Sequence, residues 1–78
     1  MKIFLDSRIF DVVVENYRQK KNCASFLRFL ADQYESAKTV MEQQERLYVN
    51  RDVEESAAWC AAHYRKIVIE CMLEEAYI

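Results

Sequence analysis

The sharpest candidate for chemistry in this sequence is the pair Cys60 and His63, which are three residues apart. On a helix this spacing puts the thiol and the imidazole on the same side, where both could bind one metal ion. A structural zinc site needs four ligands, usually from two paired motifs, and the sequence has no second pair. Cys71 is three helical turns from Cys60, about 16 Å, which is too far to share an ion with it. We therefore expect no metal site and expect the cysteines to act as small apolar side chains.

Catalytic patterns of other kinds are also missing from the sequence. A Cys–His nucleophile pair would need a third group that orients the histidine, and none can be named. The adjacent glutamates at 54–55 and 74–75 do not face one another on a helix, so they cannot act as an acid/base pair. The chain has no glycine, which excludes a glycine-rich phosphate loop. We predict a protein that is not an enzyme and that needs no cofactor.

A basic cluster supports one alternative, a dimeric nucleic-acid-binding regulator. The cluster lies near residue 20 and consists of Arg18, Lys20, Lys21 and Arg28. These side chains could bind phosphates. Against this, the net charge is −2, and the junction lacks the glycine that is usual in helix-turn-helix turns. The ordinary interpretation is a solvated helix end, so nucleic acid ranks second as a partner.

Composition predicts an all-α fold with a single domain over residues 1–78. Hydrophobic residues make up 53% and charged residues 31%, which is typical of a globular chain. Glycine and proline are both absent, and tight hairpin turns depend heavily on glycine. A chain of 78 residues buries only about two-thirds of its unfolded surface, so partner subunits are a reasonable source of extra stability.

Sequence features that report on location favour the cytoplasm. Three cysteines at unremarkable spacings fit thiols in a reducing compartment better than a disulfide framework. No apolar run approaches the roughly 18 residues needed to span a bilayer. The apolar stretch at the N-terminus is ended by Asp6 and Arg8 too soon for a signal peptide. We expect no membrane association.

The first of three predicted helices covers residues 7–20. Asp6 and Ser7 are good N-cap residues, and an apolar face then repeats at helical spacing through Tyr17. The alternative is a hairpin of residues 2–5 with 9–14, because three consecutive valines favour strands. The link between those strands lacks the Gly or Asn of short hairpin loops, so we predict a helix. Residues 1–5 form either a short extended arm or the frayed start of that helix.

Two longer helices are predicted over residues 23–48 and 53–76. In the first of them, residues that are apolar except for Gln44 alternate spacings of three and four from Leu27 to Tyr48, which is typical of a coiled-coil-like seam. Asp52 and Glu55 form the N-cap pattern of the last helix. Long helices with a short link pack antiparallel. The sequence predicts a small antiparallel three-helix bundle with one short and two long helices.

The last helix has two apolar stripes, where an outer helix of a bundle needs only one. The first stripe, which we predict to be core, contains Ala57, Cys60, Ala61, Tyr64, Val68, Cys71 and Met72. The second stripe, which we predict to face a partner, contains Trp59, Ile69, Leu73 and Tyr77. Monomers rarely expose a large contiguous apolar patch, so something must cover this second stripe. A two-fold homodimer or a larger protein complex would do so.

We therefore predict a non-catalytic protein–protein interaction module, a small helical regulator, adaptor or inhibitor that occupies a partner's surface. Many small inhibitors encoded by phages and mobile elements work in this way, which is an argument from class alone. Aromatic and large aliphatic side chains dominate such interfaces. The predicted partner-binding residues are Trp59, Leu73 and Tyr77, with Phe29, Val40 and Leu47 as a secondary patch.

Overall fold

The computed structural model describes residues 5–18 and 23–76 and confirms the all-α fold. The described residues form no strand, and they form the helices α1 (Ser7–Tyr17), α2 (Ala24–Leu47) and α3 (Ala57–Ala76), with a 3-10 turn, η2 (Val53–Glu55), before α3. The helical alternative is therefore correct for residues 7–14, and the hairpin is excluded there. The predicted arm falls largely on residues 1–4, which lie outside the described residues.

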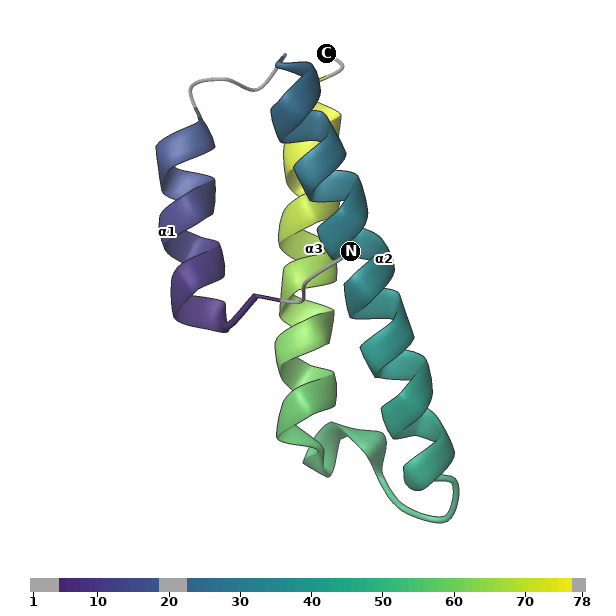
Figure 1. The fold of residues 1–78 in the computed structure, drawn as a ribbon. Helices are drawn as coiled ribbons and strands as arrows, with labels where there is room; N and C mark the ends of the chain where they lie inside the picture. Colours follow the sequence, from purple (N-terminus) through teal and green to yellow (C-terminus); the bar gives the residue numbers. More distant parts are fainter. Residues whose placement is uncertain (1–4, 19–22, 77–78) are drawn as a thin grey trace.

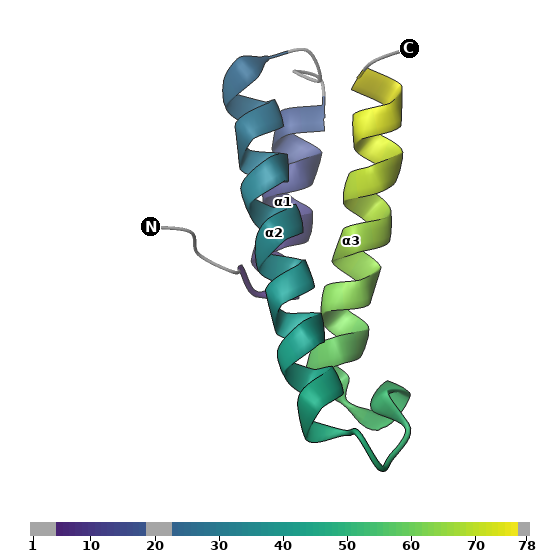
Figure 2. The same ribbon diagram turned by 90° about the vertical axis from the view of Figure 1, so that its right-hand side faces the viewer.

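The two long helices, α2 and α3, lie side by side and run antiparallel, as Figures 1 and 2 both show. The short helix α1 lies alongside the end of this pair where α2 begins and α3 ends, and it runs parallel to α3 (Figure 1). The molecule is elongated, with principal extents of 42 × 24 × 20 Å. Because α1 has 11 residues and α2 has 24, only part of the long pair has a third helix beside it.

The N-terminal end of α1 is fixed by a cap that the sequence predicts. Asp6 accepts a hydrogen bond from the backbone N–H of Arg8 at 2.9 Å through its side chain, as an N-cap residue does. Just before it, the Leu5 N–H donates to Gln33 Oε1 of α2 at 3.5 Å. The cap starts the helix with Phe10 on the inner side, where its side chain is completely buried.

The core lies where all three helices meet. It is a contact cluster of buried side chains from α1, α2 and α3, namely Phe10, Phe26, Leu30, Ile69 and Met72. Aromatic rings join α1 to α2: Phe10 stacks on Phe29 with centroids 6.3 Å apart, and Tyr17 stacks on Phe26 at 6.0 Å. Aromatic pairs at such distances add to the energy of burial itself.

One charged side chain, Arg65 of α3, is buried inside this bundle, with 2% of its surface exposed. Its Nη2 donates to Ser7 Oγ at 3.4 Å, and its guanidinium lies 5.3 Å from the centroid of the Phe10 ring. Burial lowers the pKa of Arg65, while the carboxylates of Asp6 and Asp11 act in the opposite direction. The guanidinium thus connects α3 to α1 through polar and cation–π contacts.

The start of α3 differs from the prediction, because α3 begins at Ala57 and not at residue 53. Asp52 does act as a cap, but its side chain accepts from the Glu54 N–H and so caps the short turn η2. The α3 helix is capped instead by Ser56, whose Oγ accepts from the Trp59 N–H at 3.1 Å. The Ser56 hydroxyl also donates to Gln44 Oε1 of α2 at 2.8 Å, a tertiary contact that sequence spacing cannot reveal.

Replacing Ser56 with alanine is expected to lower the free energy of unfolding by about 1–2 kcal/mol. The change removes both the cap of α3 and the hydrogen bond to Gln44, and Ser56 is only 4% exposed. Urea denaturation followed by circular dichroism measures this loss. Asp52→Ala is the matched control, and it should cost less because it caps an exposed turn. A larger loss for Asp52→Ala would assign the helix start to Asp52 after all.

Candidate protein-interaction face

The α3 helix presents an exposed apolar face to solvent, and it is not the face that the sequence pattern predicts. The exposed residues repeat at spacings of three and four and form what we call the outer stripe: Ala57, Cys60, Tyr64, Ile67 and Cys71. Within it, Tyr64 is 50% exposed and Ile67 is 46% exposed. The buried side of the same helix carries Ala62, Arg65, Ile69 and Met72.

This finding corrects the assignment of the two stripes of α3. Most of the stripe predicted as core is exposed, including Cys60, Tyr64 and Cys71, whereas Ile69 of the other stripe is fully buried. Because both stripes are apolar, periodicity alone does not decide which one faces the bundle. Polar contacts at the start of α3 fix its rotation: Ser56 donates to Gln44, and Trp59 Nε1 donates to Glu45 Oε2 at 3.1 Å.

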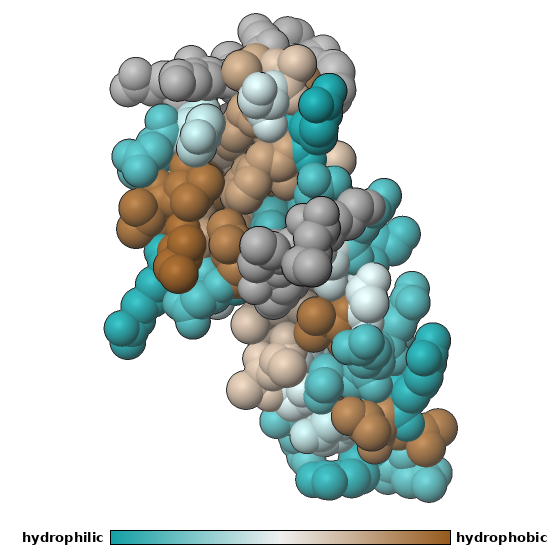
Figure 3. Space-filling model, viewed as in Figure 1, coloured by the Kyte–Doolittle hydropathy of each residue, from teal (hydrophilic) through white to brown (hydrophobic). Residues whose placement is uncertain are grey.

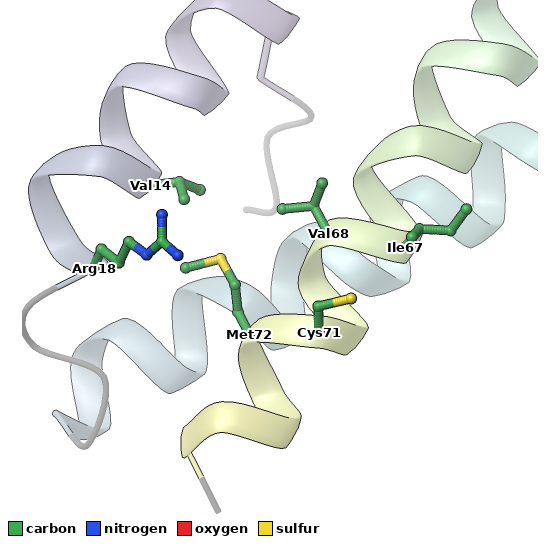
Figure 4. Close-up of a pocket in the computed structure, with 6 residues that line it drawn as sticks. All are labelled: Val14, Arg18, Ile67, Val68, Cys71 and Met72. Atoms are coloured by element: carbon green, nitrogen blue, oxygen red, sulfur yellow. The ribbon is translucent and has the colours of Figure 1, made fainter.

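A groove between α1 and α3 borders the outer stripe and widens its apolar surface. The groove has a volume of about 230 Å³ and is lined by residues of both helices: Val14, Arg18, Ile67, Val68, Cys71 and Met72. Figure 4 shows Val14 and Met72 directed toward the space between the helices, with Arg18 beside them. Figure 3 shows a brown apolar patch over α1 and, lower in the same view, a smaller tan patch.

Charged residues lie on both flanks of the outer stripe. Val68 and Met72 face the groove. Glu70 lies two residues after Val68, and Glu74 lies two residues after Met72. Each glutamate is therefore about 200° around the helix from the residue that faces the groove. Both glutamates are exposed and form an acidic edge. On the opposite flank, across the groove, lies the exposed Arg18. Glu70 is held by Lys66 Nζ at 3.3 Å and by the Tyr34 hydroxyl at 3.3 Å.

The six predicted partner-binding residues differ in how exposed the structure shows them to be. Four are half-buried, namely Phe29, Val40, Trp59 and Leu73, and Tyr77 lies outside the described residues. Leu47 is 71% exposed and, with Val49 at 78%, forms a small apolar patch at the turn after α2. Their role in binding a partner stays a prediction.

Trp59, the first of these residues, is engaged within its own chain. Its indole N–H donates to Glu45 on α2, and its ring stacks on His63 with centroids 4.8 Å apart and planes 12° apart. A tryptophan with its polar atom satisfied and its ring half-covered offers less area to a partner than a free one. Sequence reasoning missed Ile67, which stands in neither predicted stripe. Its spacing from Tyr64 and Cys71 is the signal that could have found it.

The residues considered for metal binding lie on the outer side of α3. Within residues 5–18 and 23–76, no group of three or more His, Cys, Asp or Glu side chains is placed to hold a metal ion. The exposed Cys60 thiol donates to the backbone carbonyl of Glu54 at 3.2 Å. His63 stacks on Trp59, and its Nδ1 has no hydrogen-bond partner among the described residues. Cys60 and His63 are therefore both engaged in contacts with neighbouring residues of the chain, namely Glu54 and Trp59.

The basic cluster is only partly described. Arg18 and Arg28 are exposed, the first at the C-cap of α1 and the second on α2, whereas Lys20 and Lys21 lie outside the described residues. The nucleic-acid alternative stays a prediction. Arg18 also borders the apolar groove between α1 and α3, which the sequence does not indicate.

Two further findings bear on the class of protein. None of the described helices combines the length and the apolar character needed to cross a membrane. Comparisons with models of protein families, with curated proteins and with solved structures find no match to the chain.

Proposed function

We propose that this chain is a non-catalytic protein–protein interaction module, a small helical regulator, adaptor or inhibitor that binds a protein partner through the outer stripe of α3. The observation that carries the proposal is the exposure of Tyr64 and Ile67 at the centre of an apolar stripe that runs along the helix. Contiguous exposed apolar surface typically marks a binding site. The exposed thiols of Cys60 and Cys71 fit a reducing compartment, and we place the protein in the cytoplasm.

Several features suit this face to bind protein. The spacing of three and four residues is the one with which a helix accepts a second helix, because each side chain then fits between residues of the partner. The groove beside the stripe offers about 230 Å³ to a partner side chain. Tyrosine and large aliphatic residues at the centre, with charges at the edges, follow the usual anatomy of an interface, in which an apolar centre is ringed by polar groups.

A capture experiment with matched variants tests the proposal. The wild-type chain, Ile67→Glu and Val12→Glu are coupled to beads, exposed to lysate of the native host, and the retained proteins are identified by mass spectrometry. Val12 is the control because it is an apolar helical residue of α1 that is 60% exposed and lies outside the stripe. We expect partners that wild type and Val12→Glu retain and that Ile67→Glu loses at least tenfold. Equal retention by all three forms would contradict the proposal.

A further inference from the structure

The outer stripe has a repeat that suits one particular binding partner, a second copy of this chain. From Ala57 to Cys71 the stripe advances by three, four, three and four residues and covers about 21 Å of helix. A repeat of this kind is matched by a second helix with the same repeat, and α3 of another copy supplies one. We infer that two copies associate through α3, with the two helices parallel and related by a two-fold axis along them. The inference rests on the proposed function, and it names the partner of the same face.

Charge complementarity supports the second copy and sets its direction. The acidic edge of Glu70 and Glu74 follows one flank of the stripe, and Arg18 lies on the other flank at the height of Cys71 and Met72. A two-fold axis parallel to α3 exchanges the flanks and keeps the height. It therefore brings the acidic edge of each copy toward Arg18 of the other.

An antiparallel pair lacks this match, because it would leave Arg18 and the partner's acidic edge on opposite flanks and at opposite ends. Both Arg18 and Glu74 are available for such pairing, since neither forms an ion pair with another residue in the described part of the chain. Charge pairs at the rim of an interface act mainly on partner choice and on register, and that is the role they have here.

The parallel arrangement also fixes which residues meet. In a parallel two-fold pair, equivalent positions of the stripe lie opposite one another, so Tyr64 faces Tyr64 and Ile67 faces Ile67 of the other copy. Cys60 and Cys71 each face their own counterparts. The groove between α1 and α3 gives the neighbouring side chains of the second helix room beside Val68.

The mass of the untagged full-length chain in solution is the first test. Sedimentation equilibrium over about 1–500 µM, which detects a dimer Kd in the micromolar to sub-millimolar range, is expected to give twice the chain mass of 9.3 kDa at the upper end. Ile67→Glu should return the mass to one chain, while the control Val12→Glu should leave the dimer intact. Circular dichroism must show the same helix content in all three. A wild-type monomer over the whole range, or a dimer that survives Ile67→Glu, overturns the inference.

Charge exchange tests the direction of the pair. Arg18→Glu and Glu74→Arg should each raise the dimer Kd about tenfold at low salt, because each places like charges together. Combining the two changes should lower the Kd again, since the charges then match in exchanged positions. The two side chains lie on opposite flanks within one chain, so such recovery can only come from contact between copies. Failure of the double variant to recover overturns the parallel arrangement.

Single-cysteine variants give an independent reading of direction. In one variant only Cys71 is kept and in another only Cys60, and each is oxidised with copper–phenanthroline and dissolved oxygen, which accepts the two electrons released as two thiols form a disulfide. Parallel helices bring each cysteine to its own counterpart within disulfide reach, so each variant should form a covalent dimer. Cross-linking only in an equimolar mixture of the two variants overturns the parallel pair.

Failure of this inference and failure of the proposed function are distinguishable. A wild-type chain that stays monomeric, yet retains proteins on beads through Ile67, removes the second copy as the occupant and keeps the interaction module. A dimer that depends on Ile67 but retains no other protein keeps the second copy and restricts the function to self-association.

Discussion

Replacing Phe10 with alanine is expected to lower the free energy of unfolding by about 3–5 kcal/mol, the range for a fully buried phenylalanine. The Phe10 side chain is completely buried, stacks on Phe29 and lies beneath the guanidinium of Arg65. Its loss leaves a cavity at the point where all three helices meet. Domains of this size have a total stability of about 4–12 kcal/mol, so the change removes a large share of it.

Urea denaturation monitored by the fluorescence of the single tryptophan measures this loss. Val12→Ala is the matched control, because Val12 lies on the same helix and is 60% exposed. It should change stability by less than about 0.5 kcal/mol. If Phe10→Ala cost under about 1 kcal/mol, α1 would not be part of the cooperative core.

Replacing Ala62 with glutamate is expected to unfold the protein at room temperature. Ala62 is completely buried on the inner side of α3, so the new carboxylate would be placed among side chains with no room for it and no water. An unpaired charge in such a place costs several kcal/mol, which is comparable to the whole stability of a small domain.

Far-UV circular dichroism of the Ala62→Glu variant tests this, and Ala58→Glu is the control. Ala58 is exposed near the start of the same helix, so the control should keep its helix content. Ala61→Glu should fall between the two, because Ala61 is half-buried. A folded Ala62→Glu variant with normal helix content would show that the assigned inner side of α3 is wrong.

Much of the fold is determined by interactions between residues close in sequence, and these can be predicted from the sequence. The absence of glycine and proline predicts long helices, and the observed bounds Ser7–Tyr17, Ala24–Leu47 and Ala57–Ala76 match the predicted 7–20, 23–48 and 53–76 within four residues at each described end. Asp6 caps α1 as expected. These features depend on interactions between residues close in sequence, which is why they can be read from it.

What the sequence does not reveal depends on contacts between helices. The rotation of α3 is set by the hydrogen bonds from Ser56 to Gln44 and from Trp59 to Glu45, across 12 and 14 residues. Neither pair has a sequence signature, and the two apolar stripes of α3 are equally plausible as core. For this reason the sequence predicts the binding face at Trp59, Leu73 and Tyr77. The exposed stripe instead centres on Tyr64 and Ile67.

Arg65 shows the same limit for a single residue. A charged side chain is expected on the surface, yet Arg65 is buried because α1 offers it Ser7, the Phe10 ring and two nearby carboxylates. One signal was present in the sequence, since Arg65 stands on the same helical side as Ala62, Ile69 and Met72. That side is the inner one.

The shortness of α1 has a consequence for how the molecule opens. Around Leu30 and Ile69 three helices surround the core, but towards the turn at residues 48–51 only α2 and α3 remain, with polar contacts such as that of Trp59 with Glu45 between them. Local opening should therefore be graded along the rod, with amide hydrogens near the turn exchanging fastest and those near Leu30 only on global unfolding. Proteases should cut first at this turn, at the end of the molecule farthest from α1.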